Sequence, residues 1–172
     1  MFQGWDNFYY MTGSAAAGLI GLLFVVVTLT QGRERSQALR GVSIYMTPTV
    51  LNFAVVLATS TVTTAPGLAD PVMAAVLGLG VLVGLGNALW ACVAIRALTP
   101  GSEPPHWSDF WLYGAAPAAI YLGLLATDIA LWIQADWAVD AMAGLLLALL
   151  LFGIRNAWDL VTWMAPQRNS GR

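Results

Sequence analysis

The chain has 172 residues, of which 59% are hydrophobic and 9% are charged, and its net charge at pH 7 is −2. Soluble domains carry about 25% charged residues, so this composition indicates a membrane protein. The apolar runs are continuous and do not alternate with polar residues, which disfavours a β-barrel. The chain has no lysine and its arginines form no basic stripe, which disfavours binding to nucleic acid.

Apolar runs long enough to cross a bilayer, which takes roughly 20 helical residues, recur along the chain. In chain order they cover residues 8–30, 42–65, 72–97, 110–133 and 138–163. Because the connections between them are short, we predict one domain over residues 1–172. The predicted fold class is an all-α integral membrane protein, a bundle of five transmembrane helices.

The first span opens with aromatic residues that suit a membrane interface. Asp6 precedes it where a signal peptide would carry basic residues, so we expect this span to be retained. Ser14 and Gly18, like Ala17 and Gly21, have the spacing of small residues that lets two helix backbones approach closely. The pattern indicates helix packing.

The second span is apolar but rich in hydroxyl groups. Successive residues of a helix are rotated by about 100°, so residues at certain spacings lie on the same face. In this span, one such face carries several polar residues, all within about 40° of a line along the helix. The polar members of that stripe are Tyr45, Thr49, Asn52, Thr59 and Thr63. Lipid does not stabilise such a stripe, whereas a neighbouring helix or a water-filled path does. Pro48 removes a backbone donor near the start of the span, which predicts a kink.

In the third span, Gly80 and Gly84 repeat the small-residue spacing and again indicate packing. Cys92 is the single cysteine, so the chain can form neither an intrachain disulfide nor a paired-cysteine metal site. The linker that follows holds the single histidine, His106, without a cluster of other ligands around it. We expect no metal site there.

The fourth span contains Pro117, a predicted kink, and Asp128 near its outer end. A carboxylate at mid-helix costs roughly 2.5–3.5 kcal/mol on insertion scales, so Asp128 should face protein or water. It is either an ion-binding or proton-accepting residue near an external mouth, or an interfacial carboxylate bonded to a neighbour. The candidate neighbours are Thr127, Tyr121 and a threonine of the second span.

The fifth span carries Arg155 and Asp159 near its cytoplasmic end, four residues apart and able to form an ion pair. Arginine before aspartate is the less favourable order for the helix dipole, which indicates a further partner from elsewhere in the fold. We interpret the pair as a structural clamp. The alternative is a site for an anion or a lipid headgroup, built on Arg155, Asn156 and Trp158.

Charges predict the orientation of the chain. With five spans, all seven arginines fall on one side of the membrane. On the opposite side, the charged residues are all acidic: Asp6, Asp70, Asp136 and Asp140. The positive-inside rule therefore places the C-terminus in the cytoplasm and the N-terminus outside. A missed or extra span would scatter the arginines, so the pattern also supports five spans.

Few residues could carry catalysis or hold a cofactor. No span contains a histidine, which excludes bis-histidine haem, and the absence of lysine excludes a retinal Schiff base. No cluster of histidine with cysteine or carboxylate is present within the spans. We therefore expect no enzyme activity, no cofactor and no metal.

Two functions remain open. The first is a homo-oligomeric, channel-like protein for small ions or solutes, with Asp128 at the outer mouth and Arg155 at the inner one. Because one bundle of five helices is too small for a wide conduit, a ring of subunits would surround a polar path lined by the second helix. The second is a non-catalytic accessory or scaffold subunit of a membrane complex.

In general character the chain resembles small bacterial multi-pass membrane proteins, but no named family with a known activity. We expect it to be an integral protein of a bacterial cytoplasmic membrane. The expected partners are membrane lipids, together with other copies of the chain or other membrane subunits.

Overall fold

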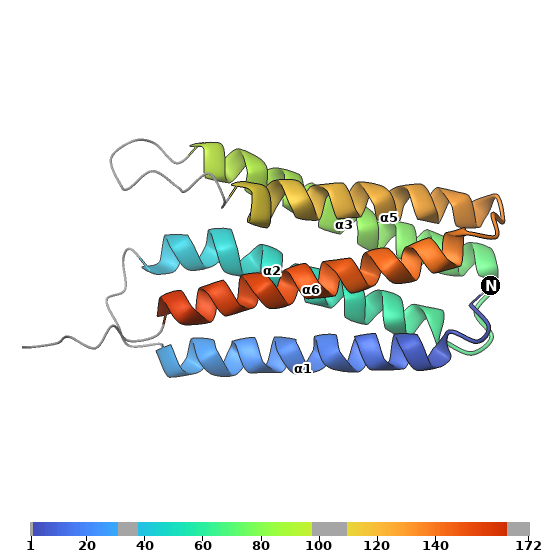
Figure 1. The fold of residues 1–172 in the computed structure, drawn as a ribbon, viewed down its shortest axis with the longest axis horizontal. Coiled ribbons are helices and arrows are strands. Elements are labelled where there is room, and N and C mark those ends of the chain that lie inside the picture. The colour runs from blue at the N-terminus through green and yellow to red at the C-terminus, as the bar shows by residue number, and fades with distance from the viewer. Residues whose placement is uncertain (1, 31–37, 98–109, 165–172) are drawn as a thin grey trace, which may run out of the picture.

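The structure is a computed structural model that describes residues 2–30, 38–97 and 110–164, and the statements below concern these residues (Figure 1). Their regular structure is entirely helical. The elements are α1 (Asp6–Thr30), α2 (Ala38–Thr63), α3 (Asp70–Ala97), the π-helix η1 (Phe110–Ala115), α5 (Ala116–Trp132) and α6 (Ala138–Met164). Helix α5 continues directly from η1, so the two together form the fourth predicted span.

Five helical segments are long and apolar enough to cross a membrane, which confirms that part of the prediction. They are Asp6–Thr28, Met46–Thr63, Asp70–Arg96, Phe110–Trp132 and Ala138–Thr162. Helix α2 begins at Ala38, before the apolar run itself, because a helix can extend past the hydrocarbon boundary into polar surroundings.

The helices lie side by side along the long axis of the molecule (Figure 1). Helix α2 packs against α1, α3 and α6, and α5 packs against α3 and α6. In Figure 1, α1 lies along one side of the bundle, α3 and α5 lie along the other, and α2 and α6 run between them. This arrangement encloses much of α2 within the bundle.

The two ends of the bundle differ in charge. One end, here called the acidic end, holds the start of α1, the α2–α3 connection and the α5–α6 connection (Figure 1). Its exposed carboxylates are Asp6, Asp70, Asp136 and Asp140. The opposite end, the basic end, holds the described side chains of Arg96 and Arg155. The side chains of the other arginines lie outside the described part, and the direction of insertion stays a prediction.

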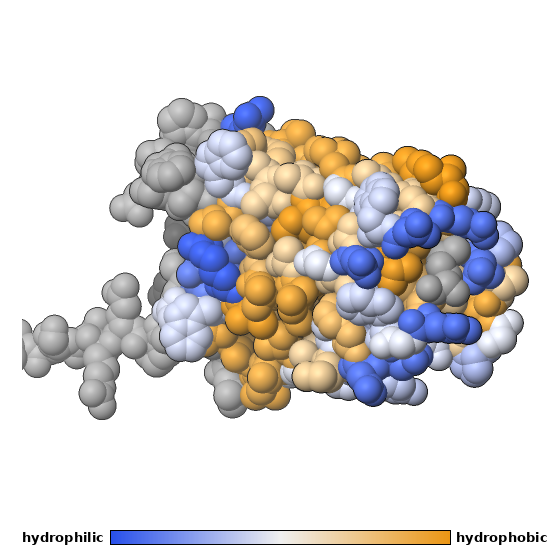
Figure 2. Space-filling model, turned by 45° about the vertical axis from the view of Figure 1, so that its right-hand side comes forward, coloured by the Kyte–Doolittle hydropathy of each residue, from blue (hydrophilic) through white to orange (hydrophobic). Residues whose placement is uncertain are grey.

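The sides of the bundle are apolar. Hydrophobic residues cover most of the side seen in Figure 2, and hydrophilic ones gather toward the acidic end. Large side chains such as Leu79, Val93 and Leu151 are more than half exposed, as expected for a surface in contact with lipid.

Glycines mark the places where helices approach closely. Gly84 of α3 leaves the space that the ring of Tyr121 occupies, and Gly13 of α1 lies against Ser60 of α2. Gly80, Gly18 and Gly21 have open space where a Cβ would be. Within the described residues, Gly18 and Gly21 of α1 therefore pack against no other helix, in contrast to Gly13.

Candidate functional site

The polar stripe of α2 is turned into the bundle of its own chain. Asn52 is 3% exposed, Thr49 is fully buried, and Thr59 and Thr63 are 5% and 7% exposed. The reason is that α1, α3 and α6 surround this face of α2. The side chain of Tyr45, the remaining member of the predicted stripe, lies outside the described residues.

Asn52 meets Tyr121 in the middle of the bundle. The hydroxyl group of Tyr121 donates a hydrogen bond of 2.9 Å to Oδ1 of Asn52, which joins α5 to α2. A Cβ on Gly84 would collide with the same tyrosine ring, so α3 also contributes to the contact. Nδ2 of Asn52 is buried and has no hydrogen-bond partner among the described residues.

Asp128 lies nearer the acidic end, between α5 and α3. It is 5% exposed, and its Oδ2 is 2.6 Å from where a Cβ on Gly78 would lie. Its Oδ1 has no hydrogen-bond partner within the described part of the chain. Two of the neighbours expected from the sequence bond elsewhere: Thr127 donates to the carbonyl of Leu124, and Tyr121 donates to Asn52.

The contact between Asn52 and Tyr121 places these two residues at one level, and both helices run from there toward the acidic end. Thr59 follows Asn52 by seven residues, and Asp128 follows Tyr121 by the same number. Seven residues return a helix to within about 20° of the same face, about 10.5 Å further along its axis. Thr59 and Asp128 therefore lie at one level, two turns closer to the acidic end. We call Asn52, Thr59, Tyr121 and Asp128 the polar seam.

Hydroxyl groups continue the polar interior between α1 and α2. Thr12 and Ser60 are joined by a buried hydrogen bond of 3.1 Å. Thr63 donates to the backbone carbonyls of Thr59 and Ser60, a common use of threonine in membrane helices. The buried hydroxyl of Tyr9 has no hydrogen-bond partner among the described residues.

At the basic end, Arg155 and Asp159 form the expected ion pair, with Nη1 and Oδ2 3.0 Å apart. Both side chains are almost half exposed, so the pair lies on the surface. Trp158 is also exposed, whereas Asn156 is fully buried. The predicted anion or lipid site therefore has Arg155 and Trp158 on the surface and Asn156 in the interior.

Asn156 compensates for Pro117. The π-helix η1 pairs each carbonyl with the N–H five residues later, and for Leu112 that residue is Pro117, which has none. Nδ2 of Asn156 donates to the Leu112 carbonyl instead, over 3.0 Å. The hydroxyl of Tyr113 returns a hydrogen bond of 3.3 Å to the backbone carbonyl of Asn156. The backbone just before Pro117 is thus a π-helical segment that α6 holds through Asn156.

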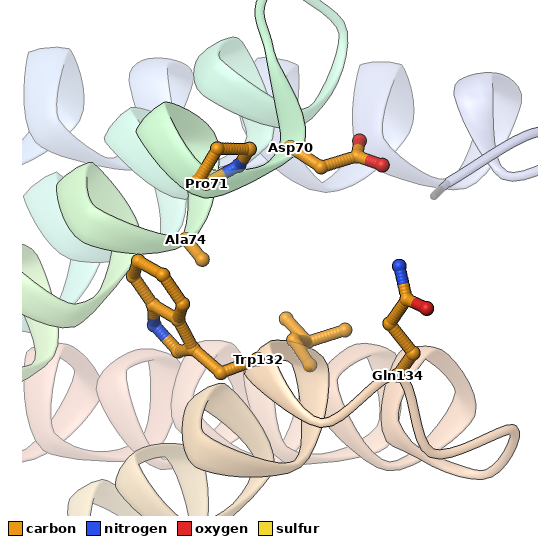
Figure 3. Close-up of a pocket in the computed structure, with 6 residues that line it drawn as sticks. Asp70, Pro71, Ala74, Trp132 and Gln134 are labelled. Carbon is orange, nitrogen blue, oxygen red and sulfur yellow. The ribbon is translucent and has the colours of Figure 1, made fainter.

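A pocket of about 180 Å³ opens between the start of α3 and the end of α5 (Figure 3). Its lining residues are Asp70, Pro71, Ala74, Leu131, Trp132 and Gln134. Sequence reasoning did not predict this site, because its two walls are about 60 residues apart in the chain. Of its lining residues, Asp70 entered the predictions only as one of the acidic residues that indicate the orientation.

Among the described residues no group of three or more histidine, cysteine, aspartate or glutamate side chains is placed to hold a metal ion. No protein-family model matches the chain, and no curated protein or solved structure matches it either. The chemistry of the interior is therefore the basis for a functional proposal.

Proposed function

We propose that the protein passes small monovalent cations, the proton included, along the polar seam inside each bundle. The observation that carries the proposal is the burial of Asp128, a carboxylate 5% exposed whose Oδ1 has no hydrogen-bond partner among the described residues. An ionisable side chain at such a depth in a membrane helix is costly, and its usual place is along an ion or proton pathway.

The charge of Asp128 has no fixed counter-charge among the described arginines. Arg96 lies at the basic end with its guanidinium 4.3 Å from the centre of the Phe110 ring, and Arg155 is paired with Asp159. A buried carboxylate without a cationic partner is neutralised by a proton or by a cation from solution. This chemistry favours a mobile cation at Asp128.

Asn52 extends the pathway toward the middle of the bundle. Its Nδ2 is buried without a partner among the described residues, and such groups in native proteins are generally satisfied by internal water. Water at this position would hydrate the path at the level of Tyr121, and Asp128 lies about 10.5 Å closer to the acidic end. The seam thus offers oxygen atoms and hydration, which suit a cation more than an anion.

The proposal places the path inside each subunit and not on an axis between subunits, because the stripe of α2 is enclosed by its own chain. A ring of copies is then not needed to form the path. The predicted homo-oligomer becomes a separate question of how the outer helix faces associate.

Flux measurements on purified protein in lipid vesicles test the proposal. Vesicles containing the protein should dissipate an imposed proton or potassium gradient faster than empty vesicles. The double variant Asn52→Leu with Thr59→Val removes polar groups at both levels of the seam and should abolish that flux. Ala58→Leu with Thr61→Val is the matched control, because both positions are on exposed faces of the same helix. Unchanged flux in the seam variant contradicts the proposal.

The second candidate, an accessory or scaffold subunit, is favoured by a different observation. Gly18 and Gly21 of α1 are exposed and face open space, with Ser14 exposed nearby. Small residues of this kind let another membrane helix approach closely. The mass of the complex in a native-like membrane mimic distinguishes the two: co-purification with unrelated subunits, lost in Gly18→Leu, supports an accessory role.

A further inference from the structure

The pocket between α3 and α5 lies next to the buried Asp128, on the side of the acidic end. Ala74 and Leu131 are buried residues of its lining. One turn deeper on the same helix faces are Gly78, four residues after Ala74, and Asp128, three residues before Leu131. Gly78 and Asp128 touch each other. A helical rise of about 1.5 Å per residue puts that contact roughly 4.5–6 Å deeper in the bundle than the pocket lining.

The rim of the pocket has the chemistry of a cation site. In Figure 3 the carboxylate of Asp70 and the amide of Gln134 extend from opposite walls toward the same side of the gap, and the Trp132 ring stands farther along it. A carboxylate and the face of an indole each attract cations. No arginine is among the residues that line the pocket.

The distribution of charge on the bundle also favours cations at this pocket. Asp70 is in the pocket lining, and the exposed carboxylates of Asp6, Asp136 and Asp140 lie at the same end of the bundle, while the described arginine side chains lie at the basic end. Such a field raises the local concentration of cations near the mouth. The pocket volume of about 180 Å³ also leaves room for hydration, since a cavity of about 10–15 Å³ on this measure can hold one water molecule.

We infer that this pocket is the entrance through which a hydrated monovalent cation or a proton reaches Asp128, with Ala74 and Leu131 forming the narrow passage between them. The inference rests on the proposed function, because it assigns the access route to the same seam. Asp70 is a positioning residue here: it concentrates cations at the mouth and does not hold them along the path.

A single reactive cysteine in the passage tests the entrance. Ala74→Cys is made in a Cys92→Ser background, so that the chain has one thiol. Ala74 is 1% exposed, and a cysteine there reacts with water-soluble reagents only if the pocket is hydrated. The probes are a cationic and an anionic methanethiosulfonate, applied to protein in lipid nanodiscs. Gln3→Cys, exposed near the N-terminus and outside the lining, is the control.

We expect the thiol at position 74 to react about fivefold faster with the cationic reagent than with the anionic one, which is what Coulomb's law gives in water for opposite unit charges about 8 Å from one carboxylate. Asp70→Asn should reduce this preference to that of the Gln3→Cys control. Modification at position 74 should also slow cation flux in vesicles. If Ala74→Cys does not fold, Pro71→Cys on the same wall replaces it.

The outcomes separate the two proposals. Absence of flux through the unmodified Cys92→Ser protein and the native chain overturns the proposed function and the entrance that depends on it. Flux that persists after complete modification at position 74 overturns the entrance alone. A charge preference unchanged by Asp70→Asn, or a thiol that does not react, also overturns the entrance and leaves the proposed function standing.

Discussion

The hydroxyl group of Tyr121 on α5 and Oδ1 of Asn52 on α2 are joined by a 2.9 Å hydrogen bond in the middle of the bundle. The same tyrosine ring fills the space beside Gly84 of α3. Three helices therefore meet at one pair of polar residues. Because α2 and α5 run in the same direction from this contact, Asp128 and Thr59 lie at a similar level along the bundle.

Replacing Tyr121 by phenylalanine should destabilise the protein. The substitution keeps the ring against Gly84 and removes the donor to Asn52, leaving a buried amide without this bond. We expect the free energy of unfolding to fall by about 0.5–2 kcal/mol. Titration of the protein in mixed micelles with a denaturing detergent measures it. Tyr10→Phe, at a residue 65% exposed, should leave the unfolding free energy unchanged.

Gly84→Ala and Gly86→Ala should have opposite effects on stability. At Gly84 the added methyl group collides with the Tyr121 ring, and overpacking of this kind costs about 1–3 kcal/mol. At Gly86 nothing lies within 4 Å of the new Cβ, so alanine should be neutral or should stabilise the helix by up to about 1 kcal/mol. The same unfolding titration compares them, and equal effects would show that α3 does not pack on Tyr121.

Asp128→Asn should abolish cation flux without unfolding the bundle. The asparagine side chain has nearly the same shape, so it fits against Gly78, but it can neither release a proton nor balance a cation. Vesicle flux should fall to the rate of empty vesicles, with the circular dichroism spectrum unchanged. Asp140→Asn, an exposed carboxylate near the start of α6, is the control and should retain flux. Normal flux in Asp128→Asn would remove this residue from the pathway.

A hydrophobic carbodiimide provides a separate test of Asp128. Such reagents couple to protonated carboxyl groups within membranes, so the buried carboxyl should be labelled and flux should be lost in parallel. Mass spectrometry of proteolytic fragments locates the adduct. A monovalent cation that binds at Asp128 should slow the labelling when added in excess. Labelling that occurs only on exposed aspartates is the contrary result.

Asn156 and Pro117 should be energetically coupled. Asn156→Leu leaves the Leu112 carbonyl without its donor, and we expect a cost of about 1–3 kcal/mol. In a Pro117→Ala background the restored backbone N–H can serve that carbonyl, so the same substitution should cost less. A double-mutant cycle measured by unfolding should give a coupling energy of about 1 kcal/mol. Identical costs in the two backgrounds would mean that Asn156 does not compensate for the proline.

Features that depend on one segment of the chain could be predicted from the sequence. The spans were predictable because the length and apolar character of a segment are local properties that can be read against bilayer thickness. The ion pair between Arg155 and Asp159 was predictable because a four-residue separation on a helix places them side by side.

Other features depended on distant parts of the chain. The stripe of α2 could be found from its period, but its surroundings could not, because they are set by α1, α3 and α6. Asn156 was grouped with Arg155 on the basis of proximity in sequence, although successive helical residues point about 100° apart. Its partner, the carbonyl of Leu112, lies on another element.

The sequence by itself determined five membrane-length helices and the separation of acidic from basic ends, since both follow from composition along the chain. Only the tertiary structure decided which way the polar residues face and which of them meet. Asn52 and Tyr121 are 69 residues apart, and their contact exists because Gly84 lets a third helix approach. Which helix faces come into contact depends on how all the helices pack together. It therefore cannot be read from any single segment.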